Sequence, residues 1–318
     1  MEPTCARTRQ CRSRSATHRP PRQGCGMNGM GPIRRYTPVV ILGAGRSGTN
    51  LLRDGLTRLN GVATWPCDEV NYLWRSGAKR FPTDEFTPSM ATPAVQRRIV
   101  AGFDWVARRY GAKWVVEKTC ANTLRPGFVN AVLPNARFIH LTRDGFDVTA
   151  SAMKRWTAPI ELRYLAKKAR FVPLSDLPYY ASRYLLGHAR RRFSEDRALR
   201  SWGPRFEGIE ELRASNSLAV VCATQWRRCV DVATTQLAEL PSHRVYSLTY
   251  ESLVNDPARS LKRVADFLEI PTTDQLTGEF AKSIRPGSVG AGKRSLSESD
   301  IATIQPIVHA ASHRFHAA

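Results

Sequence analysis

Acidic residues are scarce in this 318-residue chain. Asp and Glu together number 27 against 48 Lys and Arg, which gives a formal net charge of +21. With 42% hydrophobic and 9% aromatic residues the chain can bury a core, so it is not a disordered basic protein. The positive charge instead indicates an anionic partner, and the candidates are nucleic acid, a membrane surface and a small polyanionic ligand.

Long apolar runs and patterned cysteines are also missing. No window reaches the roughly 18 uninterrupted apolar residues of a membrane-spanning helix, so we expect none. The seven cysteines show neither zinc-site spacing nor a disulfide framework. We therefore expect a protein of a reducing compartment, without a metal, in the cytoplasm and with the membrane periphery as a second location.

The positive charge is unevenly distributed. Residues 1–35 hold eight arginines and one acid without apolar periodicity, which predicts a disordered basic N-terminal tail. The tail lacks the apolar stretch of a secretory signal, and its composition suits an organellar transit peptide. Met27 and Met30 are alternative starts, so it stays open whether the mature protein contains the tail.

Residues 36–318 are predicted to form one α/β domain. Short apolar strands are expected at 38–42, 113–116, 136–141 and 244–248, with a further strand before Asp68, and helices at 51–59, 126–133, 146–154, 219–240 and 257–268. This alternation favours a parallel sheet with helices on both faces. The basic, aromatic-rich stretch 152–215 is predicted to be a helical insert, either a solvated one or a cap that faces substrate or membrane.

The first strand runs into a glycine-rich loop, Gly43-Ala44-Gly45-Arg46-Ser47-Gly48-Thr49-Asn50, at the start of a helix. Backbone N–H groups and the helix dipole converge at such a loop, which therefore favours an anion. As a dinucleotide fingerprint the pattern is weak by itself, and as a nucleoside-triphosphate loop it has Thr49 in place of the lysine. The strand 136–141 also ends in Thr142-Arg143 rather than in an acid for Mg²⁺. An anion cradle without a metal is the third interpretation.

In this third form the loop resembles that of the sulfotransferases that use 3′-phosphoadenylyl sulfate (PAPS), where it holds the 5′-phosphosulfate. Arg143 and Ser151, eight residues apart, are similar to the family's 3′-phosphate motif. The segment 285–293 is similar to the family's loop that closes over the same phosphate. The resemblance extends over about residues 38–296, because 245–268 also looks like the family's penultimate strand and helix.

The resemblance implies a P-loop-type parallel sheet and PAPS as co-substrate, with no metal. The donor-binding residues that it implies are Arg46, Ser47, Gly48, Thr49, Asn50, Arg143, Ser151, Arg285, Gly287 and Lys293. The sequence departs from the family at Pro286 and Gly292, where lysine and tryptophan are more usual. We therefore expect a looser hold on the adenosine end.

Sulfuryl transfer needs cations on the leaving phosphate and a base for the acceptor. The resemblance places Arg46 at the bridging oxygen and Lys118 as a second cation. Glu69 and Glu117 are the candidate bases, and Glu69 is favoured because related carbohydrate and tyrosylprotein enzymes have their proposed base at about this point. The remaining candidates are Asp68 and His140. No histidine stands where the cytosolic small-molecule enzymes have their base, which points away from phenol and steroid acceptors.

The sequence thus predicts a sulfotransferase that moves the sulfuryl group of PAPS to a hydroxyl of a carbohydrate, glycolipid or similar acceptor, by metal-independent in-line transfer. An anionic membrane surface is a further expected partner. One alternative is a P-loop nucleotide or small-molecule kinase, which the missing lysine disfavours. The other is a basic nucleic-acid-binding protein, for which no helix-turn-helix, zinc-finger or RNA-binding signature is present. The acceptor and the oligomeric state are left open.

Overall fold

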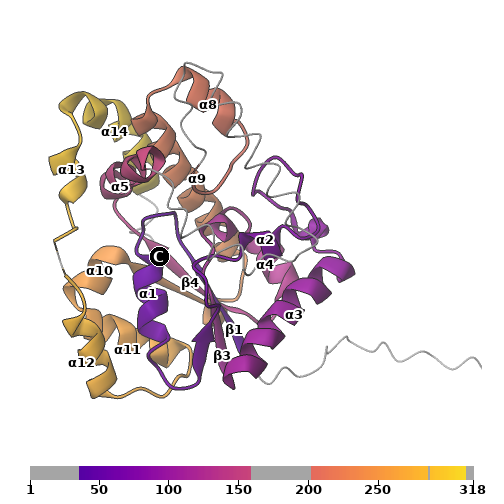
Figure 1. The fold of residues 1–318 in the computed structure, drawn as a ribbon. Coiled ribbons are helices and arrows are strands. Elements are labelled where there is room, and N and C mark those ends of the chain that lie inside the picture. Colours follow the sequence, from indigo (N-terminus) through magenta and orange to yellow (C-terminus); the bar gives the residue numbers. More distant parts are fainter. Residues whose placement is uncertain (1–35, 159–201, 286, 313–318) are drawn as a thin grey trace, which may run out of the picture. The chain divides into compact units, whose positions relative to one another are not determined.

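The structure is a computed structural model, and it describes residues 36–158, 202–285 and 287–312 (Figure 1). The predicted tail, residues 1–35, lies outside these ranges. So does the part of the predicted insert from 159 to 201. The described ends of that insert are residues 152–158, at the end of the helix Gly145–Thr157, and residues 202–215, which include the helix Ile209–Ser215.

Five parallel strands form the centre of the described domain, in the order β2-β3-β1-β4-β5. Their bounds are Thr37–Leu42 (β1), Val62–Thr64 (β2), Trp114–Glu117 (β3), Arg137–Thr142 (β4) and Val245–Thr249 (β5). Strand β1 pairs with both β3 and β4, so the chain order reverses there. The carboxyl end of β1 is the topological switch point at which open α/β sheets bind ligands. The predicted α/β fold is confirmed.

Helices connect these strands and continue beyond them. In the described ranges they are α1 (Thr49–Leu56), α2 (Asn71–Trp74), α3 (Pro93–Tyr110), α4 (Pro126–Val132), α5 (Gly145–Thr157), α8 (Ile209–Ser215), α9 (Leu218–Ala238), α10 (Tyr250–Asn255), α11 (Pro257–Phe267), α12 (Asp274–Lys282), α13 (Ala291–Ser295) and α14 (Glu298–Ser312), with 3-10 turns η1 (Pro88–Met90), η2 (Cys120–Leu124) and η3 (Ser242–Arg244). Within these ranges every helix is too short or too polar to cross a bilayer.

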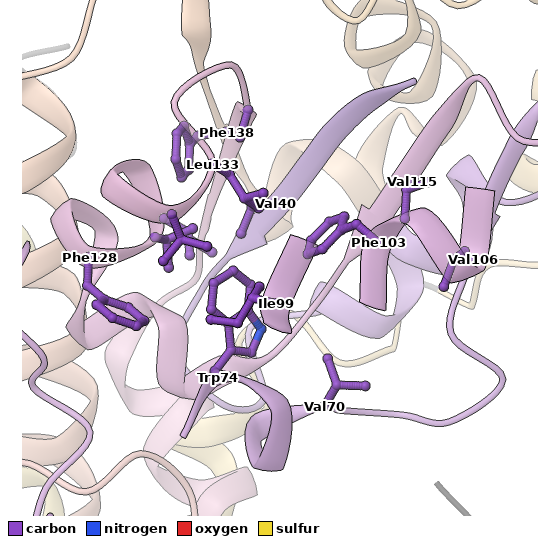
Figure 2. Close-up of a cluster of buried hydrophobic side chains, with 14 of the residues drawn as sticks. Val40, Val70, Trp74, Ile99, Phe103, Val106, Val115, Phe128, Leu133 and Phe138 are labelled. Carbon is purple, nitrogen blue, oxygen red and sulfur yellow. The ribbon is translucent and has the colours of Figure 1, made fainter. Parts of the chain in front are cut away.

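Both faces of the sheet are covered, because strand side chains alternate between two cores. Val40 of β1 belongs to a cluster with α3 and α4, while its neighbour Val39 belongs to a cluster with α1 and α11. Figure 1 shows α3 and α4 on one side of the strands and α1, α11 and α12 on the other. In the first cluster, drawn in Figure 2, the indole of Trp74 meets Phe103 and Phe128 edge to face, at ring centroid distances of 6.2 and 6.4 Å. The strands whose carboxyl ends form this edge are therefore buried on both faces of the sheet.

Candidate functional site

The glycine loop joins β1 to α1 at the carboxyl edge of the sheet, as predicted. Gly48 caps α1 with a φ of 89°, and Arg46 also has a positive φ, 76°, which is uncommon for a residue with a side chain. A Cβ at Gly43 would lie 2.6 Å from the carbonyl oxygen of Leu141, and one at Gly48 would overlap the ring of Tyr250. These glycines are therefore required by the close contact of the loop with β4 and α10.

Two buried polar groups at this loop have no hydrogen-bond partner in the described part of the chain. They are the hydroxyl of Ser47, a residue 1% exposed, and Nε of Arg143, 9% exposed. Both lie at the same loop, since Nη1 of Arg143 donates to the carbonyl of Arg46 at 3.0 Å. A buried donor left unpaired costs on the order of 1–3 kcal/mol, so an anion that accepts from both groups fits here. Thr49 is buried beside them, whereas Asn50 is exposed.

The 3′-phosphate motif is joined directly to the glycine loop. Nε of Arg46 donates a hydrogen bond to Oγ of Ser151 on α5, at 2.9 Å. The residues expected at the two phosphorylated ends of PAPS, 105 positions apart in the chain, therefore meet in one cluster of cations and hydroxyls.

Arg155 belongs to this cluster, although the sequence analysis did not single it out. It follows Ser151 by four positions on α5, so the two residues lie on the same helix face. Burial first, and then the positive charges of Arg155 and Arg143, lower the pKa of Arg46. Among the described residues no carboxylate forms an ion pair with Arg46 or Arg155. The four-residue spacing from the motif serine was the sequence signal that identifies Arg155.

The segment 285–293, which holds the predicted donors Arg285, Gly287 and Lys293, forms the loop after α12 and the start of α13, and it contacts Arg143 and α5. Nη2 of Arg143 donates to the carbonyl of Ser288 at 2.7 Å. The amides of Gly290 and Gly292 donate to the carboxylate of Asp147 at 2.9 and 2.6 Å. Three hydrogen bonds thus attach this loop to the 3′-phosphate motif.

Glycine at position 292 is a steric requirement. A Cβ there would overlap the carbonyl group of Phe146, so the tryptophan that is more usual in the family does not fit this arrangement. Nζ of Lys293 lies 4.8 Å from the centroid of the Phe146 ring. Arg285 and Gly287 are exposed in the same loop. Pro286, the other departure from the family, lies outside the described residues.

The described end of the predicted insert also contacts the glycine loop. A Cβ at Gly45 would lie 2.8 Å from Cη2 of Trp202, so the indole covers the loop. The carbonyl of Trp202 accepts from Nε2 of Gln225 on α9 at 2.9 Å, which anchors this end. Trp202 therefore forms one wall beside the predicted phosphosulfate site.

Lys118, the predicted second cation, directly follows β3 and lies between two carboxylates. Its Nζ is 3.0 Å from Oε1 of Glu69 and 3.2 Å from Oδ1 of Asp68, and its side chain is 2% exposed. Burial alone would lower the pKa of Lys118, but the anionic groups around it, Glu69 and Asp68 among them, raise it. Lys118 is therefore a buried cation.

The two candidate bases differ in access. Glu117 is fully buried, and its oxygens accept hydrogen bonds from the hydroxyl of Thr119 and, at 2.9 Å, from the amide of Asn122. Burial raises the pKa of Glu117 to about 7. The Glu69 side chain is 24% exposed, and only its Oε1 is held, by Lys118 among others. Its Oε2 bonds to no described residue, so Glu69 has a free oxygen for a proton and Glu117 has none.

The two remaining candidates are placed less well. Asp68 accepts from Arg53 at 2.9 Å, and although burial acts in the opposite direction, the charges of Lys118 and Arg53 lower the pKa of Asp68. Oδ2 of Asp68 bonds to no described residue either, so Asp68 differs from Glu69 in its second cation, Arg53, which favours the ionised form and makes it a weaker base. His140 lies on β4 and lines a different cavity, with Thr142 and Ser247.

Comparison with known proteins identifies the family. The sequence matches the model described as "Sulfotransferase family" over residues 38–200 and 204–274. Solved structures similar to this chain include a sulfotransferase domain from the curacin biosynthetic pathway, with 15% identity, a TM-score of 0.49 and coverage of 85% of this chain and 96% of that one. Sulfotransferase STF9 from Mycobacterium avium has 13% identity, a TM-score of 0.49 and coverage of 86% and 75%. Mouse sulfotransferase SULT7A1, complexed with PAP, has 12% identity, a TM-score of 0.46 and coverage of 90% of each chain.

The family match covers β1 to β5 and with them the glycine loop, Lys118, Arg143 and Ser151. It ends before the loop that carries Arg285 and Lys293, whose assignment stays a prediction. The chain therefore belongs to the sulfotransferase family, as the resemblance of its anion-binding loop predicted.

Proposed function

We propose that this sulfotransferase transfers the sulfuryl group of PAPS to a hydroxyl of a carbohydrate, glycolipid or similar acceptor, with Glu69 as the base. One observation carries the proposal. Lys118 and Glu69 form a pair at the carboxyl end of β3, 3.0 Å apart, and the second oxygen of Glu69 has no partner among the described residues. A cation and a proton acceptor thus stand side by side.

The donor is proposed to lie across the ends of β1 and β4. Arg46, Ser47 and Thr49 would hold the phosphosulfate, and Arg143 and Ser151 the 3′-phosphate. The hydrogen bond between Arg46 and Ser151 supports this arrangement, because one nucleotide must reach both groups. The proposed donor set is completed by Gly48, Asn50, Arg285, Gly287 and Lys293.

The proposed transfer step depends on stabilising the negative charge of the transition state. By analogy with phosphoryl transfer, the transition state is loose and spreads charge over the transferred oxygens and the leaving phosphate. Arg46 and Lys118 would stabilise that charge without a metal. The S–O bond to the phosphate breaks, a new S–O bond forms to the acceptor oxygen, and the hydroxyl proton passes to Glu69. Donor binding would draw Lys118 toward the phosphosulfate and leave Glu69 free to accept this proton.

A carboxylate base supports a sugar-type acceptor, as in the related carbohydrate enzymes. The described histidines lie elsewhere: His140 lines the cavity at β4, His243 precedes β5, and His309 is in α14. In none of the described contacts does a histidine reach Lys118 or Glu69. An anionic membrane surface and a cytoplasmic location remain part of the proposal.

Ligand-induced stabilisation tests the proposal. We expect PAP and PAPS to raise the Tm, whereas ATP–Mg²⁺ and NAD do not. A ligand at 100 times its Kd stabilises the folded state by about 2.7 kcal/mol, which is well within reach of a thermal-shift measurement. Equal or greater stabilisation by ATP–Mg²⁺ would support the kinase alternative and contradict the proposal. A screen with labelled PAPS then tests the acceptor class, and labelling of phenols or steroids alone would contradict a carbohydrate acceptor.

A further inference from the structure

A cavity lies apart from the proposed donor and base residues, at the edge of the sheet formed by β5. Its volume is about 500 Å³, and it runs along β5, the last strand, between α9 and α11. None of the residues proposed for PAPS, and neither Glu69 nor Lys118, lines it. We call this cavity the β5 groove. The lining residues that matter here are His140, Thr142, Thr234, Ser247, Arg259 and Arg263.

Free hydroxyl groups form one wall of the β5 groove. The side chains of Thr142 and Ser247 stand on neighbouring strands, and Thr234 faces them from α9. In the described ranges none of these three hydroxyls has a hydrogen-bond partner. His140 adds a ring nitrogen donor and acceptor, since burial lowers its pKa to about 4 and leaves it neutral at pH 7. This wall suits a ligand with several hydroxyls.

Two arginines of α11 also line the groove. Arg259 and Arg263 are exposed and lie four positions apart, so they share one face of α11. Neither guanidinium bonds to another residue that the structure describes, whereas that of Arg137, for example, is paired with Glu269 at 2.8 Å. Asp256 is the one acid of the lining, and it caps α11 by accepting from the amide of Arg259. The lining therefore keeps an excess of positive charge.

The groove thus presents free hydroxyl groups together with two guanidiniums that no described carboxylate neutralises. One class of ligand, with both hydroxyl and acidic groups, would contact all of them. Guanidinium forks bind sulfate, phosphate and carboxylate groups. We propose that the β5 groove is a second binding site, for an anionic oligosaccharide, whose ring hydroxyls contact Thr142 and Ser247 and whose acidic group contacts Arg259 and Arg263. This second site goes beyond the proposed function, because the groove lies apart from Glu69 and Lys118.

Calorimetric titration of the full chain tests this inference. The protein is first saturated with PAP, which fills the donor site, and is then titrated with a sulfated tetrasaccharide. We expect saturable binding that weakens at least tenfold in the double variant R259A/R263A. The control R108A/R109A removes the same charge from the exposed end of α3 and should change the affinity less than twofold. Unchanged Tm values and PAP affinities show that both variants are folded.

Two further titrations separate the parts of the ligand. Inorganic sulfate should bind more weakly than the tetrasaccharide and lose its binding in R259A/R263A. A neutral tetrasaccharide should bind weakly and equally in both variants.

Equal affinity of the sulfated ligand for the two double variants, or no saturable binding to the wild type, overturns the inference. Sulfate binding as tight as that of the sulfated tetrasaccharide overturns its saccharide part. A wild type that fails to bind PAP contradicts the proposed function instead, so the two failures are distinguishable.

Discussion

Substitution of Glu69 by Gln removes the proposed proton acceptor and keeps the size of the side chain. General-base catalysis contributes typically about 10²–10⁴-fold, so we expect kcat to fall at least 100-fold. The Kd for PAP should stay within twofold, because Glu69 is not among the proposed donor-binding residues. Single-turnover transfer from labelled PAPS, together with calorimetry of PAP, measures both quantities. Near-normal turnover of Glu69→Gln would move the assignment to Glu117.

Arg155 became a candidate for phosphate binding from the structure and not from the sequence. We expect Arg155→Ala to weaken PAP binding about tenfold, which corresponds to the loss of about 1.4 kcal/mol of interaction with a phosphate. Arg108→Ala, an equal loss of charge on α3, should leave the PAP affinity within twofold. AMP, which lacks the 3′-phosphate, should bind both variants equally. An equal loss of AMP and PAP affinity in Arg155→Ala would assign Arg155 to the 5′ end instead.

At the scale of elements, the attachment of the α12–α13 loop depends on glycine at position 292, which has no side chain. A methyl group there would overlap the Phe146 carbonyl, so Gly292→Ala must displace the loop from Asp147 and Arg143. We expect weaker PAP binding and faster proteolysis of the loop, with little change in Tm. In the control Gly278→Ala, in α12, the added methyl meets no atom within 4 Å, so the PAP affinity and the proteolysis of the loop should match those of the wild type. Unchanged PAP affinity in Gly292→Ala would show that the loop does not contribute to the donor site.

The elements next to the glycine loop could be predicted from the sequence because each signal there is local. The strand 38–42, the glycine turn and the strand 136–141 are consecutive apolar and turn residues, and all three are present as β1, its loop and β4. Helix α3 was missed although its signals are present. Thr92 caps it, and Val95, Ile99 and Phe103 recur every fourth residue on its buried face. Arginines between these apolar positions obscured the period.

The tertiary contacts of the site could not be predicted from local sequence signals. The sequence favoured Glu69 over Glu117 only through the resemblance to related enzymes, because the difference in burial between the two carboxylates depends on what covers each of them. The contact of Arg46 with Ser151, and the position of Arg155 beside it, depend on how α5 packs against the glycine loop. Likewise the reason for glycine at position 292 is a backbone contact with another helix.

At the scale of the whole molecule, Glu117 couples stability to pH. Burial raises its pKa from the usual 4.5 to about 7 in the folded protein. Between these values the folded state binds more protons than the unfolded one, so stability falls as pH rises through this window. Glu117→Gln removes this dependence. We expect urea unfolding to show that the wild type loses up to about 3 kcal/mol relative to the variant between pH 5 and pH 8.

A matched control accompanies this measurement. Glu239→Gln changes an exposed carboxyl at the end of α9, and its stability should follow that of the wild type at every pH. His140 gives the opposite slope below pH 6.5, since burial lowers its pKa, but it is present in all three proteins and cancels in the differences. Parallel pH profiles for the wild type and Glu117→Gln would contradict a protonated, buried Glu117.

The hydrogen bond between Arg46 and Ser151 has a consequence for how the enzyme would choose among cellular nucleotides. The two side chains that would receive the two ends of the donor are each other's partners. A nucleotide with a phosphate at the 5′ position alone would take Arg46 away from Ser151 and return nothing to the serine. A nucleotide phosphorylated at both ends would compensate both losses. Selection would then depend on the joint presence of two phosphate groups, and a nucleotide with only one of them would need a correspondingly higher concentration to compete.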